Sequence, residues 1–153
     1  MGREADVGKD RTWLLLAYKV PRDPTASRVY VWRKLKKLGA VSLQDAVWVL
    51  PQTPQTLEHF RWLAAEIAEM KGEASLWESR HLLDGQDERL AAQFDGQVRP
   101  VYEKILKGLK GKKPNLAALS RQYQQAASQD YLRSATGDKV RAALIAARQE
   151  EGK

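Results

Sequence analysis

Short apolar runs and one-sided apolar stripes alternate through the first half of the chain. Four segments have the length and residue pattern of β-strands: 13–20, 40–43, 46–50 and 73–78. The first run ends at Pro21, and its shortness together with that proline favours a buried strand over a helix. Gln44 and Asp45 separate the second run from the third, so these two strands are expected to form a hairpin.

Two amphipathic helices are expected between these strands. Their apolar stripes are Val31, Trp32, Leu35 and Leu38 in the first helix and Leu57, Phe60, Leu63, Ile67 and Met70 in the second. The first helix follows Asp23–Pro24, a capping residue before a first-turn proline, and ends at Gly39. The second follows Thr53–Pro54 and ends at Gly72.

The resulting element order is strand, helix, strand, strand, helix, strand. This is the order of the ferredoxin-like arrangement, in which two helices cover one face of a four-stranded antiparallel sheet. We therefore predict an α+β fold with a ferredoxin-like βαββαβ domain over residues 12–83. The fold by itself does not indicate a function, because many functions occur on it.

The chain after Asp84–Gly85 is expected to be a C-terminal helical extension over residues 84–148. Its first helix, predicted over 86–111, contains Gly96 and Pro100, which favour a break or a kink. Asn115 is expected to cap the next helix, and residues 136–138 are expected to precede the last one. Residues 1–11 and 149–153 are predicted to be flexible termini.

Composition narrows the possible classes of protein. The 153 residues include no cysteine, which excludes disulfides, thiolate metal sites and cysteine nucleophiles. The first residues carry charges of both signs and lead into no apolar segment, so they do not form a secretory signal. No run approaches the roughly 18 apolar residues that a membrane span requires. We expect a soluble cytoplasmic protein without a membrane partner.

The positive charge of the chain is local. The net charge is +7, yet residues 28–44 and 104–129 contain eleven basic residues and no acid, so the rest of the chain is slightly acidic. Such windows are typical of a surface that meets phosphates or another polyanion, and also of a solvated lysine-rich helix face.

No catalytic or cofactor motif is present. The chain has two histidines, His59 and His81, and neither has a partner at metal-ligand or triad spacing. Both are expected at the surface. We expect no enzyme activity, no metal and no cofactor. Of the five tryptophans, Trp32 is notable because it lies at the edge of the apolar stripe beside Arg33.

Several blocks of the sequence resemble one known family. They are Trp13–Leu16, the block from Arg28 to Val41 that begins RVYVWRKLKKLG, Val47–Pro51 and Gly72–Arg80. These blocks are similar to the N-terminal domain of the ChrB chromate-resistance regulators. They are more distantly similar to the C-terminal half of PaaX-type repressors and to the small CRISPR adaptation nucleases.

The resemblance implies a DNA-binding, chromate-responsive regulator of a resistance operon. Full regulators of this kind have a second domain of comparable size after this one. The nuclease relatives carry a metal-binding aspartate near the end of the first strand, where this chain has Lys19. Since a protonated lysine cannot hold Mg²⁺, the resemblance does not extend to nuclease activity.

Two hypotheses for function follow. In the first, the chain is a DNA-binding transcriptional regulatory module that contacts the phosphate backbone through Arg28, Arg33, Lys34, Lys36, Lys37, Lys104, Lys107 and Lys110. In the second, it is an accessory domain that pairs with a separate regulator domain or with a second copy of itself, without binding DNA directly.

A site for the chromate or sulfate oxyanion is also expected. A cysteine-free chain must bind such a dianion through cations and backbone N–H groups. The candidates are Arg28 at the start of the first helix, with Lys19 and Arg80 if the strand ends align. Alternatively, Arg28 forms an ion pair with Glu73 or Glu78.

Because sulfate matches chromate in shape and charge, we predict that the chain binds both dianions weakly and alike. Calorimetric titration with each anion measures this directly. A tight chromate response that sulfate does not compete away would contradict the prediction.

Overall fold

The computed structural model describes residues 11–23 and 25–152. Residues 1–10, Pro24 and Lys153 lie outside the described residues. Two expectations fall there: most of the flexible N-terminus, and the first-turn proline of the first helix. The chain forms two compact units, with the division between Leu90 and Ala91. No helix in the described residues is both long enough and apolar enough to cross a membrane.

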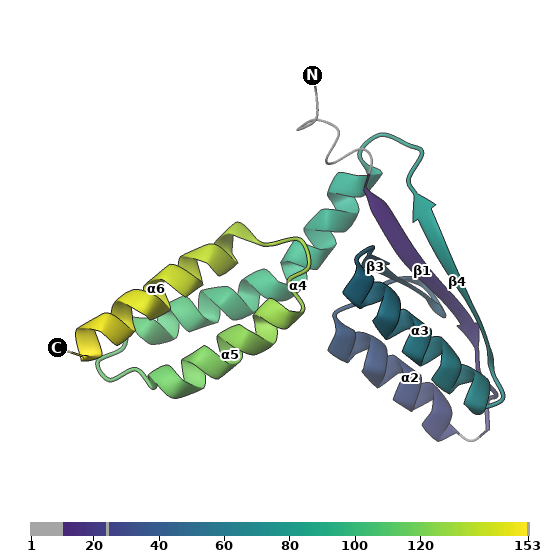
Figure 1. The fold of residues 1–153 in the computed structure, drawn as a ribbon, viewed down its shortest axis with the longest axis horizontal. Coiled ribbons are helices and arrows are strands. Elements are labelled where there is room, and N and C mark those ends of the chain that lie inside the picture. Colours follow the sequence, from purple (N-terminus) through teal and green to yellow (C-terminus); the bar gives the residue numbers. More distant parts are fainter. Residues whose placement is uncertain (1–10, 24, 153) are drawn as a thin grey trace. The chain divides into compact units, whose positions relative to one another are not determined.

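The first unit has the predicted βαββαβ order. Its elements are β1 (Thr12–Lys19), α2 (Thr25–Leu38), β2 (Val41–Gln44), β3 (Val47–Pro51), α3 (Pro54–Glu69) and β4 (Glu73–Arg80). The strands form one antiparallel sheet in the order β2-β3-β1-β4, and both helices lie on one side of it (Figure 1). This is the ferredoxin-like topology, so the predicted α+β fold is confirmed.

Local sequence signals set the ends of the helices. Thr53 caps α3 by accepting a hydrogen bond from the backbone N–H of Thr56, whose side chain in turn accepts from the Thr53 N–H. Pro54 occupies the first turn, where no N–H donor is needed. Helix α2 is followed by Gly39, whose φ of 78° is in the left-handed region that glycine adopts without strain.

The core of this unit forms around β1. Leu14 and Leu16 of β1 and Leu50 of β3 are at most 1% exposed. The two helices contribute the buried side chains Val31, Leu35, Phe60, Leu63 and Ile67. These five belong to the stripes that the 3.6-residue periodicity predicts.

The turn between α3 and β4 brings two backbones into close approach. A Cβ atom at Gly72 would lie 2.4 Å from the carbonyl oxygen of Lys19 and 2.9 Å from the side chain of Ile67. Real side chains do not reach such distances, so this position requires glycine.

A buried carboxylate connects the sheet to the first turn of α4 (Gln86–Leu109). Asp87 is 4% exposed and accepts hydrogen bonds from the Trp13 indole at 2.8 Å, from the His81 ring at 2.6 Å and from the Arg11 backbone N–H at 3.3 Å. Burial alone would raise the pKa of Asp87, but these hydrogen bonds outweigh burial and hold the pKa below its ordinary value. His81, expected at the surface, is therefore partly buried and part of this network.

The second unit contains the remainder of α4 together with α5 (Leu116–Ser128) and α6 (Ala135–Glu151). Its core consists of Val98, Tyr102, Ile105, Ala126, Val140 and Leu144. Of the break or kink expected in α4, no break occurs, and α4 continues as one helix through Pro100. Asn115 caps α5 as predicted, by accepting a hydrogen bond from Ala118. Residues 136–138, expected before the last helix, lie inside its first turn.

A partly buried hydrogen-bond network holds this unit together. The hydroxyl of Tyr102 donates to the Asp130 carboxylate at 2.9 Å, and the same carboxylate accepts from the backbone N–H of Ser134 just before α6. Burial and the neighbouring carboxylate of Asp130 both raise the pKa of Tyr102 strongly. Asp130 therefore links α4 to the start of α6.

Replacing Asp87 with asparagine tests the first network. We expect Asp87→Asn to lower the free energy of unfolding by about 1–3 kcal/mol at neutral pH. The NH2 group of asparagine cannot accept a hydrogen bond, so at least one of the donors that Asp87 now satisfies would lose its acceptor. The depressed pKa stabilises the fold above the carboxyl's ordinary pKa of 3.8, so the difference from wild type should shrink as pH falls through the lower folded value. Urea unfolding over a pH series measures it.

The control for this experiment is Asp84→Asn, which alters an exposed carboxylate three positions away. It should leave the free energy of unfolding nearly unchanged at every pH. Equal effects of the two variants would contradict the proposed stabilising role of Asp87.

Replacing Tyr102 with phenylalanine tests the second network. We expect a loss of about 1.5–3 kcal/mol, since the deleted hydrogen bond reaches a charged group. Tyr123→Phe is the matched control, because its ring packs on the same core and no hydrogen bond of its hydroxyl is recorded in the described residues. Urea unfolding distinguishes the two variants, and similar losses would contradict the assigned bond.

Candidate nucleic-acid interface

Helix α2 carries five basic residues and no acidic residue. Its buried face is formed by Val31 and Leu35. As the helical periodicity predicts, Arg33, Lys36 and Lys37 are exposed, whereas Lys34 is half-buried. This helix therefore presents positive charge along its outer surface.

Arg28, at the N-terminal end of α2, is also exposed. Within residues 11–23 and 25–152, Arg28 forms no ion pair with Glu73 or Glu78, so the alternative expectation for this residue is not met. Arg28 instead lines a groove.

The groove runs between α2, the end of β1 and the turn that joins β2 to β3. It has a volume of about 900 Å³. Four cationic residues line it, Lys19, Arg22, Arg28 and Lys36, together with one acidic residue, Asp45. The surplus of cations creates a concave surface with positive potential, which favours an anionic ligand.

Aromatic residues form much of the remaining wall. Trp48 is only 6% exposed, Tyr18 is half-buried, and Trp32 is 52% exposed although it belongs to the predicted apolar stripe. The Lys36 ammonium lies 5.9 Å from the centroid of the Trp32 ring, at the outer range of a cation–π contact. An exposed indole beside cations is suited to stacking on a planar group.

The pKa of Tyr18 depends on the charged residues that line this groove. Burial raises the pKa of the Tyr18 phenol and is the largest effect. A hydrogen bond with Trp48 and the positive charge of Arg28 lower the pKa, and the negative charge of Asp45 raises it. Charges from α2 and from the hairpin therefore act on the same hydroxyl.

The expected anion-binding residues are only partly brought together. Lys19 and Arg28 both line the groove, with Arg22, which the sequence analysis did not identify. Arg80 does not join them, because β4 is antiparallel to β1: Lys19 lies opposite Glu73, and Arg80 lies opposite Thr12. Seven residues of strand, roughly 23 Å, separate the two ends.

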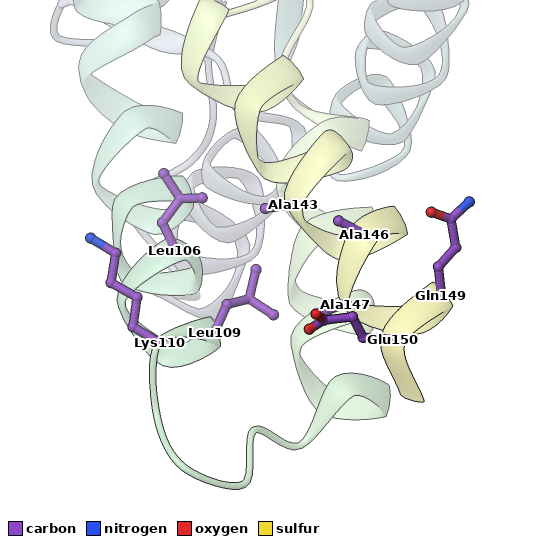
Figure 2. A pocket seen from close by; sticks show the side chains of 8 residues that line it. All are labelled: Leu106, Leu109, Lys110, Ala143, Ala146, Ala147, Gln149 and Glu150. Carbon is purple, nitrogen blue, oxygen red and sulfur yellow. The ribbon is translucent and has the colours of Figure 1, made fainter. Parts of the chain in front are cut away.

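Of the remaining candidates, Lys104 and Lys107 are exposed on the part of α4 that belongs to the second unit, and Lys110 is exposed directly after the last residue of that helix. They form a separate basic strip there. Lys110 also borders a pocket of about 540 Å³ between α4 and α6. Figure 2 shows its apolar wall, formed by Leu106, Leu109, Ala143, Ala146 and Ala147.

Comparison with known proteins assigns the family. The fold first places the N-terminal unit among α+β domains of ferredoxin-like topology. A family model described as "Protein ChrB, N-terminal" then matches residues 28–117, more than half of the chain. The chain belongs to this family, which links it to chromate resistance.

The chain is similar to a curated protein and to a protein of known structure. Protein ChrB of Cupriavidus metallidurans is 30% identical over 86 residues, which cover 56% of this chain and 26% of that protein. The matched region therefore spans about a quarter of the curated relative. The uncharacterized protein Rv0674 of Mycobacterium tuberculosis has a TM-score of 0.63 at 15% identity, with 97% of this chain and 68% of that chain covered. The second similarity concerns the fold alone.

Two substitutions test the geometry of the groove. Since the charge of Arg28 lowers the pKa of Tyr18 and the charge of Asp45 raises it, Arg28→Ala should raise that pKa further and Asp45→Ala should lower it. NMR titration of protein with ¹³C-labelled tyrosine rings measures both shifts. If neither variant moves the Tyr18 titration, its hydroxyl does not face these charges.

Proposed function

We propose that this chain is a DNA-binding regulatory module of chromate resistance and that the groove beside α2 is its binding surface. The observation that carries the proposal is the excess of four cations over one acid around this groove. Exposed Arg33 and Lys37 extend the positive surface along α2. Family membership supports the connection with chromate resistance.

The proposed role is one of binding. Lysine and arginine side chains neutralise phosphates and release the counterions that surround DNA, which makes affinity depend steeply on salt. Arg28 adds planar, paired N–H donors that match two phosphate oxygens, while Lys19 and Lys36 act as point charges. Such contacts position a protein on DNA without reading its sequence.

The same cations suit a tetrahedral dianion such as chromate or sulfate. Lys19, Arg22 and Arg28 line one groove, so a bound oxyanion would occupy charge that DNA phosphates also need. We therefore include in the proposal that these anions compete with DNA.

A second candidate function is that of an accessory domain that pairs with another protein chain. It is favoured by Leu82 and Leu83, adjacent side chains in the first unit that are 90% and 72% exposed. Light scattering and a duplex-binding assay separate the two functions. A stable protein complex without affinity for DNA would favour the accessory role.

Reversing two charges in the groove tests the proposed DNA binding. Arg28→Glu combined with Lys36→Glu should weaken DNA binding about tenfold or more. It should also lower the slope of log affinity against log salt by roughly 2, since each phosphate contact contributes about 0.9. Fluorescence anisotropy over a salt series gives both quantities.

The matched control is Arg61→Glu combined with Arg80→Glu. It changes the net charge by the same amount at two exposed residues that do not line the groove. It should retain most of the affinity. If both double variants lose affinity equally, net charge and not the groove determines DNA binding.

A further inference from the structure

The groove contains a feature that contact with a phosphate backbone does not require. Trp32, the largest aromatic side chain of α2, lies on its wall with about half of its surface exposed. Burying this indole would remove apolar surface from water, and nothing in a phosphodiester backbone covers a flat apolar ring.

The cations around Trp32 have a regular arrangement. Arg28 precedes it by four residues and Lys36 follows it by four, and all three line the groove. Residues four apart lie on one helix face, about 6 Å apart along the axis. A planar group stacked on the indole would therefore have a cation within reach on either side.

A nucleotide in a strand has the matching chemistry, because each base lies between two phosphates. Stacking on an aromatic ring accepts any base, since every base has a π-face. The contact of Lys36 with Trp32 is a long one at 5.9 Å, so a base can replace it while the ammonium turns to a phosphate. Asp45 repels phosphates, which places the backbone of the strand on the α2 side of the groove.

Stacking on Trp32 restricts the form of DNA that the groove can bind. Both faces of a base inside a duplex are already stacked on neighbouring bases, so only an unpaired or extruded base can stack on Trp32. We propose that the groove binds an unpaired nucleotide, with its base on Trp32 and its flanking phosphates on Arg28 and Lys36. This inference rests on the proposed DNA-binding function and names the part of the DNA that the groove takes.

Anisotropy with three labelled probes tests it: a single DNA strand, its fully paired duplex, and the same duplex with one extra unpaired thymine. Trp32→Ala should weaken binding of the single strand and the bulged duplex by about tenfold or more, the effect of losing one stacked base. Binding of the paired duplex should change by less than about twofold. The salt slope should remain constant, because no charge is removed.

Two further variants complete the design. Trp32→Phe keeps an aromatic ring and should retain most of the affinity for the unpaired probes. This variant therefore separates a loss of stacking from a folding defect in Trp32→Ala. Trp77→Ala removes an indole on β4 that is 60% exposed and does not line the groove, so it should have no effect.

The outcomes separate this inference from the function on which it rests. If Trp32→Ala weakens all three probes equally, or none of them, the stacking role is wrong. If Trp32→Ala has no effect while charge reversal at Arg28 and Lys36 abolishes binding, the proposed DNA-binding function is supported and the stacking role is wrong. If the wild-type chain binds none of the three probes, the proposed function itself falls.

Discussion

Strand β1 satisfies its backbone hydrogen bonds on both edges, because β3 pairs along one edge and β4 along the other. The rest of the first unit depends on this double pairing. At the start of β1, Trp13 donates to the carboxylate of Asp87 and so attaches the beginning of α4. At its end, Lys19 reaches the groove. The central strand β1 thereby positions two features of the first unit: the first turn of α4 and the candidate binding groove.

The groove combines local and distant parts of the sequence. Arg28, Trp32 and Lys36 come from successive turns of one helix, and their spacing follows from helical geometry alone. Tyr18 and Asp45 come from a strand end and a hairpin turn, and only the folded sheet brings them to α2. The positive potential is thus encoded largely in α2, whereas the concave shape requires the whole domain.

The sequence was sufficient for the element order and for most of the core, because strand length, capping residues and apolar periodicity are local signals. The sequence was insufficient where strand register or tertiary packing determines the position of a residue or the course of a helix. Arg80 was expected beside Lys19, but antiparallel pairing places the first residue of β4, not the last, beside the end of β1. Of the break or kink expected near Pro100, the helix shows no break, since Val98, Tyr102 and Ile105 on both sides of the proline are buried in one core. Tyr18 and Trp48 gave no local signal of a shared site.

The close approach at Gly72 has a consequence for the interpretation of genetic variants. Any side chain there would push against the carbonyl oxygen of Lys19, and Lys19 is a residue of the groove. A substitution at position 72 would therefore disturb the strand end that carries the groove-lining charge of Lys19, although residue 72 does not line the groove. In a screen for loss of the proposed regulatory function, such a mutation would be difficult to distinguish from damage to the proposed binding surface. Only a measurement of folding would show that the primary defect is steric.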